Sequence, residues 1–142
     1  MFRKTILLLS ITLLAAGISG RADNVAMDSL SVNDLMVTVI TPATDTLWGI
    51  EDPQSDAEWQ VFLEAADVVI AAGNQLKAGG TGPDDNEWAA TAEWQAFADR
   101  LVAAGVQAKT AAAGKDLDGM FTAGEVLYPP CEECHLQFHP GL

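Results

Sequence analysis

The segment Cys131-Glu132-Glu133-Cys134-His135 lies close to the end of the 142-residue chain and indicates which group the fold has to bind. Its C-x-x-C-H spacing is the attachment pattern of a covalently bound c-type haem. On one helical turn Cys131 and Cys134 lie on the same side, so both thiols can bond to the two vinyl groups of one porphyrin. His135 is then directed at the iron as the proximal axial ligand. Since these are the only two cysteines in the sequence, the motif predicts one covalent haem c.

Two other kinds of site use the same residue types. A C-x-x-C pair can exchange disulfides, but that motif normally opens a helix in a βαβ context, and no such strand pattern occurs here. A zinc site would need a second pair of ligands. The only other histidine is His139, so an Asp or Glu would have to complete the zinc set. Both sites remain alternatives to haem.

The helix that carries the motif is predicted to begin after Asp116. Apolar residues then recur at helical spacing as far as Phe138, and the motif continues their face. Pro129-Pro130 interrupts this pattern, because proline lacks the amide hydrogen and clashes with the preceding turn. We therefore expect a break just before Cys131, with the motif opening a short final helix.

Three further segments repeat apolar residues at steps of three and four. They cover residues 32–48, the stretch from Ser55 to the loop at residues 79–83, and residues 85–113. Pro42 is expected to kink or interrupt the first segment, and Gly114 to end the third. Four amphipathic helices with short links predict an all-α fold, an antiparallel four-helix bundle with one covalently bound haem inside.

The first 22 residues have the composition of a secretory signal peptide. Residues 1–4 are basic, residues 6–14 are almost wholly apolar, and small residues lead to a cleavage site after Ala22. We therefore predict a signal peptide at residues 1–22 and one helical haem-binding domain at residues 23–142. Export to a periplasm agrees with the motif, because bacteria attach c-type haem outside the cytoplasm. An uncleaved membrane tether is the alternative, although the apolar core is short for a bilayer span.

Removal of this segment leaves a strongly acidic chain. Four basic residues then stand against 20 acidic ones, a net charge of −16 with neutral histidines. Such a charge argues against nucleic acid and anionic membranes as partners. It favours an encounter with a redox partner that has a basic docking surface. An acidic surface that serves solubility alone is the other interpretation.

The chain resembles the class II cytochromes c, the group of cytochrome c′ and cytochrome c556. The resemblance rests on Cys131, Cys134 and His135, on their position near the C-terminus, and on the helical layout of residues 31–139. It implies a four-helix bundle with the haem held by the last helix. It also implies a homodimer as one oligomeric state, because class II proteins often pair through their first two helices.

The resemblance also supplies a candidate for the distal side of the iron. Low-spin members use a methionine of the first helix as the sixth ligand, and Met36 lies on the apolar face of the predicted first helix. The family often has an arginine four residues earlier, but Val32 stands there, so a contact with the haem propionates must come from elsewhere. An ordinary core methionine is the alternative for Met36.

Three kinds of function are compatible with a single haem held in this way. The leading hypothesis is a periplasmic monohaem electron carrier that cycles between Fe(II) and Fe(III), with no catalytic residue and with periplasmic or membrane redox proteins as partners. The second is binding of nitric oxide or carbon monoxide at an open distal site. Peroxidase chemistry would require a distal acid or base, and the first helix offers only Asp34 and Asp45, off the apolar face.

Overall fold

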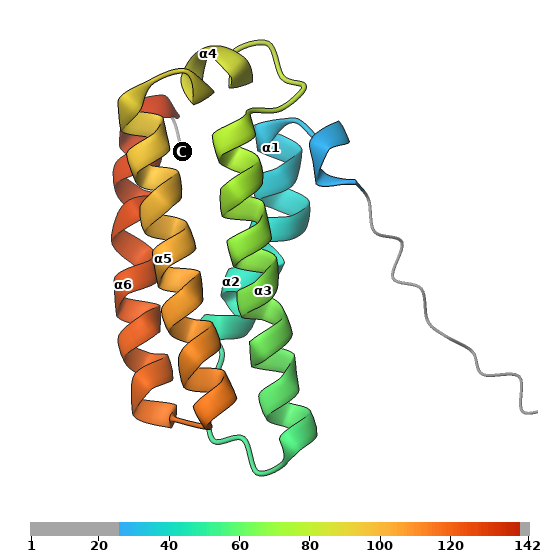
Figure 1. The fold of residues 1–142 in the computed structure, drawn as a ribbon, viewed down its shortest axis with the longest axis vertical. Coiled ribbons are helices and arrows are strands. Elements are labelled where there is room, and N and C mark those ends of the chain that lie inside the picture. Colours follow the sequence, from blue (N-terminus) through green and yellow to red (C-terminus); the bar gives the residue numbers. More distant parts are fainter. Residues whose placement is uncertain (1–25, 140–142) are drawn as a thin grey trace, which may run out of the picture.

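The computed structural model describes residues 26–139, and this part of the chain is all-α (Figure 1). The predicted fold class is therefore confirmed at that level. A short 3-10 helix, η1 (Met27–Ser29), precedes the main helices. None of the described helices is long and apolar enough to cross a membrane. The predicted signal segment at residues 1–22, with its cleavage site after Ala22, lies outside the described residues.

Residues 32–48 are helical throughout, but their hydrogen bonding changes on the way. α1 (Val32–Leu35) passes into a π-helical turn, η2 (Met36–Ile40), and then into α2 (Thr41–Trp48). This turn lies immediately before Pro42, in the first turn of α2, and proline removes one donor from the helical hydrogen-bond pattern at this point. The expected interruption therefore takes the form of a widened turn, and the chain stays helical.

The second predicted helix starts as its sequence indicates. α3 (Asp56–Ala78) has Ser55 as its N-cap, and the Ser55 and Glu58 side chains complete a capping box. This reciprocal arrangement satisfies donors that the first turn of a helix leaves free. Gly79 ends the helix with φ of 90°, a conformation that favours glycine.

The third predicted helix is divided in two, which the sequence analysis did not anticipate. α4 (Asp85–Ala89) ends at an exposed Ala90, and α5 (Ala92–Gly114) starts anew. The reason is Thr91, whose hydroxyl accepts a hydrogen bond from the Trp94 amide at 3.3 Å and caps the new helix. Gly114 remains helical, and Lys115 takes the left-handed conformation that ends α5.

α6 (Leu117–Phe138) runs unbroken through Pro129-Pro130, so the predicted break before Cys131 is wrong. The prolines leave the carbonyl groups of Glu125 and Val126, four residues earlier, without their helical donors. Both residues are exposed, so water can hydrate those carbonyls. The motif is therefore the last part of a long helix and not the start of a short one.

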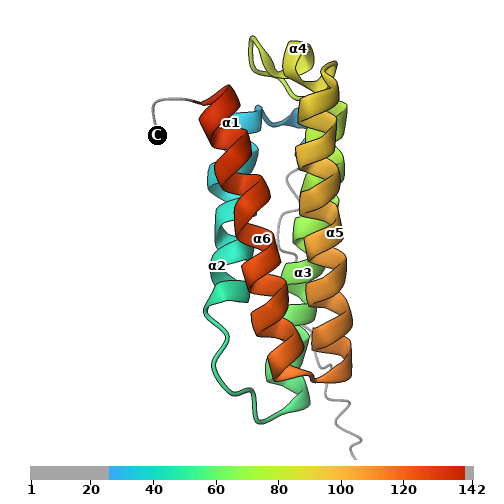
Figure 2. The same ribbon diagram turned by 90° about the vertical axis from the view of Figure 1, so that its left-hand side faces the viewer.

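The long helical segments lie side by side, and successive segments run in opposite directions (Figures 1 and 2). α3 packs along α5, α5 along α6, and α2 contacts both α3 and α6. α3 and α5 approach closely at two glycines: a Cβ added to Gly73 would lie 2.7 Å from a Val102 methyl, and one added to Gly105 would lie 2.9 Å from Ile70. Small residues thus set the distance between these two helices.

A buried carboxylate ties the start of α1 to the loop that precedes α4. Asp85 is only 4% exposed, and its Oδ2 accepts hydrogen bonds from the amides of Val32 at 2.8 Å and Gly82 at 2.7 Å. Next to it, the Thr81 amide donates to the Leu30 carbonyl at 3.1 Å. Asp85 therefore supplies an acceptor at the N-terminus of the helix that carries Met36.

Candidate functional site

The predicted haem-binding residues lie on the last turns of α6. Cys131, Cys134 and His135 are all partly buried, and both cysteines are free thiols. Since they are spaced by three and four residues, they share one side of the helix, as the motif requires. Next to this turn, the Cys131 thiol donates to the Leu127 carbonyl at 3.3 Å. The fold thus presents the two sulfur atoms together, toward the interior.

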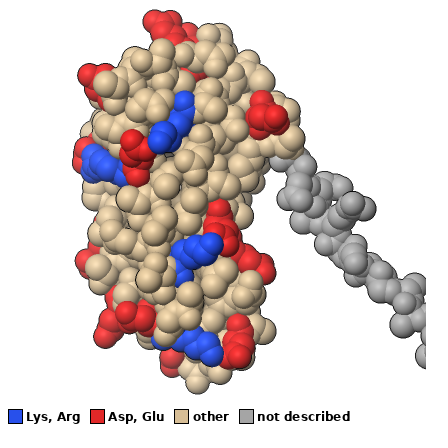
Figure 3. Space-filling model, viewed as in Figure 1, with Lys and Arg blue, Asp and Glu red and all other residues tan. Residues whose placement is uncertain are grey.

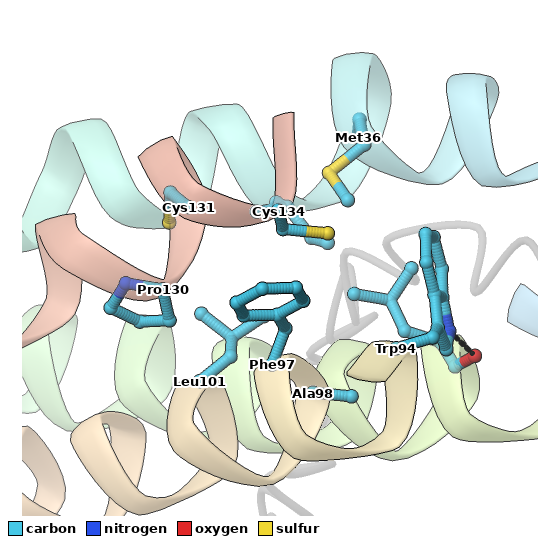
Figure 4. A pocket seen from close by; sticks show the side chains of 10 residues that line it. Met36, Trp94, Phe97, Ala98, Leu101, Pro130, Cys131 and Cys134 are labelled. Carbon is cyan, nitrogen blue, oxygen red and sulfur yellow. Dashed lines mark hydrogen bonds between the residues drawn. The ribbon is translucent and has the colours of Figure 1, made fainter. Parts of the chain in front are cut away.

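Both thiols line an apolar cavity that is closed by three other helical segments. Figure 4 shows Cys134 and Met36 extending toward the same space, with Phe97 and Leu101 of α5 on its other side. The lining side chains are all apolar or sulfur-bearing: Met36, Ile40, Leu76, Trp94, Phe97, Ala98, Leu101, Pro130, Cys131 and Cys134. The predicted distal residue therefore lies in the same cavity as the predicted attachment residues, whereas His135 is not among the lining residues.

Met36 owes its place in the cavity to the amphipathic pattern of the first segment. Leu35 and Ile40 are 1% and 5% exposed, so this face of the segment is turned into the protein. Met36 is partly buried beside them and is the first residue of the π-helical turn. Turns of this kind occur frequently at functional sites. The structure thus makes Met36 available to the cavity without burying it completely.

Aromatic side chains close the cavity at the end where α6 finishes. The ring of Phe138 meets Trp94 edge-on, with centroids 5.1 Å apart, and lies 6.0 Å from Trp88 and 6.4 Å from Phe97. The indole nitrogen of Trp94 donates to the Leu76 carbonyl at 2.7 Å, so its ring is fixed in orientation. Trp94 and Phe97 thus give the cavity an apolar wall, and Phe138 packs against both of them.

The chemistry of the two thiols argues against disulfide exchange. Burial raises the pKa of Cys131, and burial together with the neighbouring Cys131 raises the pKa of Cys134 to about 11. Exchange-active C-x-x-C pairs need a lowered pKa, because the thiolate is the attacking species. At neutral pH both groups here are neutral thiols. The first alternative to haem is therefore unsupported by the local electrostatics.

The second alternative, a zinc site completed by an Asp or Glu, finds no ligand set within residues 26–139. No three His, Cys, Asp or Glu side chains of that range are grouped so that they could hold a metal ion. His139 is exposed at the end of α6, where its amide donates to the His135 carbonyl at 2.8 Å. It follows the motif by one helical turn and is not a lining residue of the cavity.

The other methionines in the described part of the chain take packing positions. Met120, on the same helix as the motif, is 1% exposed and belongs to the core. Met27 is partly buried in η1 and packs against the same core. Met36 is therefore the one methionine of residues 26–139 that lines the cavity.

Sequence reasoning missed an ion pair that ends inside the motif. Arg100 of α5 donates to both carboxylate oxygens of Glu133, at 2.6 and 2.9 Å. The pair lowers the pKa of Glu133, chiefly through the hydrogen bond. The two residues are 33 positions apart in sequence, so no local pattern could have found the pair. Only the packing of α5 along α6 brings them together.

The side chains at the cavity fit a covalent haem in their chemistry, but the cavity is too small for a porphyrin ring. Two neutral thiols on one helical turn, a histidine on the same turn and a thioether across the cavity are the groups that such a cofactor uses. The cavity itself has a volume of only about 30 Å³. Its apolar lining side chains must therefore move outward before a porphyrin can occupy it.

Comparison with known proteins assigns no family to the chain. No protein-family model matches the chain, and neither a curated protein nor a solved structure matches it significantly.

Proposed function

We propose that this protein is an exported monohaem c-type cytochrome that carries electrons. The proposed architecture is an antiparallel four-helix bundle, built from residues 32–48, α3, α5 and α6, with one haem attached to Cys131 and Cys134. When bound, the haem supplies an iron that accepts and releases one electron between Fe(III) and Fe(II). The single observation that carries the proposal is the pair of neutral thiols of a C-x-x-C-H turn directed into an apolar cavity.

Each residue of the site has a distinct task in this proposal. The sulfur atoms of Cys131 and Cys134 anchor the ring covalently, and His135 is the proximal ligand. Met36, across the cavity, is the candidate distal ligand. Trp94, Phe97 and Phe138 exclude water from the ring, which together with a methionine ligand favours the reduced iron. None of these residues carries out bond-making chemistry on a substrate.

The composition of the cavity supports electron transfer over peroxidase chemistry. A peroxidase needs a distal acid or base within reach of the bound oxidant. Among the described residues that line this cavity there is no His, Asp or Glu. The same apolar lining also suits a neutral diatomic gas. Binding of nitric oxide or carbon monoxide is therefore the second candidate, and it requires that Met36 leave the iron open.

The proposal extends to location and partners. Periplasmic export rests on the composition of residues 1–22. An acidic chain with few basic groups suits a redox partner with a basic docking surface, because opposite charges steer the encounter. The resemblance to class II cytochromes c adds a homodimer, paired through the first two helical segments.

The test is the absorption spectrum of protein purified from a host that attaches haem to exported proteins. Mass spectrometry first shows whether one haem is covalently attached, and Cys131→Ala with Cys134→Ala should abolish the attachment. Oxidised and reduced spectra are then recorded with and without carbon monoxide, for the wild type and for Met36→Ala. Met120→Ala is the matched control, because Met120 is a buried core methionine outside the cavity.

For an electron carrier we expect a low-spin spectrum with a methionine–iron charge-transfer band that is insensitive to carbon monoxide. The band should be lost in Met36→Ala and kept in Met120→Ala. A high-spin spectrum that shifts at once with carbon monoxide would remove Met36 as ligand and select gas binding. A purified wild type without covalent haem would contradict both functions.

A further inference from the structure

One ion pair connects the wall of the cavity to the middle of the motif. The guanidinium of Arg100 and the carboxylate of Glu133 form two parallel hydrogen bonds, with Nη1 2.6 Å from Oε2 and Nη2 2.9 Å from Oε1. Such forked bonds fix the orientation of both planar groups. On its other side, the guanidinium carbon of Arg100 lies 5.9 Å from the centre of the Phe97 ring, which lines the cavity. We call these two residues the Arg100–Glu133 pair.

The place of this pair differs from that of the other ion pairs. Lys77–Asp99, Lys109–Asp67 and Lys115–Asp56 connect α3, including its first turn, with α5 or with the residue that ends α5. Within residues 26–139, only the Arg100–Glu133 pair connects α5 with α6. Its side chains are 44% and 48% exposed, and exposed pairs contribute little to stability. We therefore consider the position of its two charges, beside the motif, and not its contribution to stability.

The basic side chains of the described chain are all used in these four pairs. On the face seen in Figure 3, the Lys and Arg side chains lie next to Asp or Glu side chains. Glu133 stands between the two cysteines and two residues before His135 in the same helix, so its charge lies within one helical turn of the proposed iron ligand. Arg100 neutralises this carboxylate in place.

The two members of the pair have opposite effects on the iron. Fe(III) carries one more positive charge than Fe(II), so a nearby negative charge favours the oxidised iron and a nearby positive charge the reduced iron. With both members present, the two charges cancel each other, whereas Glu132, the other carboxylate of the motif, has no basic partner among the described ion pairs. Loss of Arg100 would leave a bare carboxylate there, and loss of Glu133 would leave a bare guanidinium.

We propose that the Arg100–Glu133 pair tunes the reduction potential of the haem, because Arg100 neutralises the Glu133 carboxylate inside the motif. This inference rests on the proposed haem at Cys131 and Cys134 and adds two positioning residues to it. The electron itself comes from a redox mediator or partner protein, and it enters the iron without any proton transfer by the pair.

The experiment measures the reduction potential of the haem-loaded protein by spectroscopic titration at low salt. The variants are Arg100→Gln, Glu133→Gln and the double variant. The matched controls are Lys109→Gln and Asp67→Asn, because that pair is exposed to nearly the same extent, 46% and 48%. Lys109 lies nine residues, about 14 Å, further along α5. Arg100→Lys tests whether charge alone is sufficient.

We expect shifts of opposite sign. Arg100→Gln should lower the potential and Glu133→Gln should raise it, each changing the ratio of reduced to oxidised protein about two- to fivefold for a charge on the order of 10 Å from the iron. The double variant and Arg100→Lys should lie close to the wild type, and the control variants should show no shift of this kind. Both shifts should shrink in 1 M salt, where charges are screened beyond about 3 Å.

Two results would overturn the inference. If both single variants move the potential in the same direction, the pair acts through the local structure and not through its charges. This result would overturn the inference even if the thermal melting curves of the variants were unchanged. If neither variant moves the potential, the pair has no electrostatic role. In both cases the wild type still carries haem and the proposed function stands. A wild type without haem would instead remove the proposed function and this inference together.

Discussion

At the scale of single residues, the site separates what sequence spacing can predict from what it cannot. Cys131 and Cys134 could be placed because both lie on one helical turn, a local relation. The position of Met36 opposite them depends on two segments about 95 residues apart in the chain, and a helical pattern alone leaves its partner open. Arg100 and Glu133 gave no signal at all. A charged residue on an exposed helix face can pair with many other charged residues. Which one it contacts depends on how the helices pack.

Asp85 provides a residue-scale prediction. Replacement by Ala would leave the buried amides of Val32 and Gly82 without their acceptor, so we expect the free energy of unfolding to fall by about 1–3 kcal/mol. Denaturant unfolding followed by circular dichroism measures it. Asp84→Ala is the control, since that exposed neighbour makes no side-chain cap, and its effect should stay within about 0.5 kcal/mol. Equal effects of both substitutions would contradict a structural role for Asp85.

The raised pKa of Cys134 predicts how the stability of the haem-free protein depends on pH. The ordinary value is 9.0 and the folded value is about 11, so between these values the unfolded chain loses the proton while the folded protein keeps it. The unfolded state is therefore favoured progressively as pH rises through this window, and stability falls. Below pH 9 both states hold the proton and this effect is absent.

The measurement is urea unfolding at a series of pH values from 8 to about 11, without oxygen and with a reductant, for the haem-free wild type and Cys134→Ser. The wild type should lose more stability than the variant across the window. The same slope in both proteins would show that Cys134 titrates normally in the folded state.

At the scale of helical elements, local sequence signals predicted where a helix begins better than whether it continues. The start of α3 followed from Ser55 and Glu58, because a capping box is contained in four residues. The break before α5 was missed, because Thr91 caps within a run of good helix formers whose spacing reads as one helix. The continuity of α6 was missed for the opposite reason. Packing of its apolar face against α5 holds a helix that two prolines would end in isolation.

Pro129 provides a prediction at the scale of helical elements: its replacement should stabilise α6. Pro129→Ala restores an amide that can donate to the Glu125 carbonyl, so we expect the haem-free protein to become more stable by about 1–3 kcal/mol. Denaturant midpoints report the change. Pro53→Ala, in the irregular stretch before α3, is the control and should bring no such gain. A lower stability of Pro129→Ala would mean that the proline ring makes packing contacts that outweigh the new hydrogen bond.

At the scale of the whole molecule, the helices share one continuous core. The buried apolar residues of all the long segments form one cluster, and no side-chain nitrogen or oxygen buried in the described residues lacks a hydrogen-bond partner. The all-α class could be predicted because helical periodicity runs through most of the chain. The small size of the cavity could not, because it depends on how Trp94, Phe97 and Leu101 fill the space in front of the motif.

This core predicts that the chain folds without the proposed haem. The variant with Cys131→Ser and Cys134→Ser should give a strongly helical circular dichroism spectrum and a single cooperative thermal transition. Leu101→Ala in the same background, which removes a buried core side chain, should lower the free energy of unfolding by about 2–5 kcal/mol. A spectrum without cooperative melting would show that the core forms only around the haem.

The proline pair of α6 also divides that helix into two units of local opening. Pro129-Pro130 carries no amide hydrogen, so the carbonyls of Glu125 and Val126, two exposed residues, lose their helical donors. Deuterium uptake at the amides of residues 131–138 should therefore rise independently of uptake at residues 120–128, which are anchored by Met120 and Leu127. The last turns of α6 can thus unwind on their own while the rest of the protein stays folded. An attachment enzyme would then meet the two thiols as a short peptide, with the remaining helices already in place to close over the product.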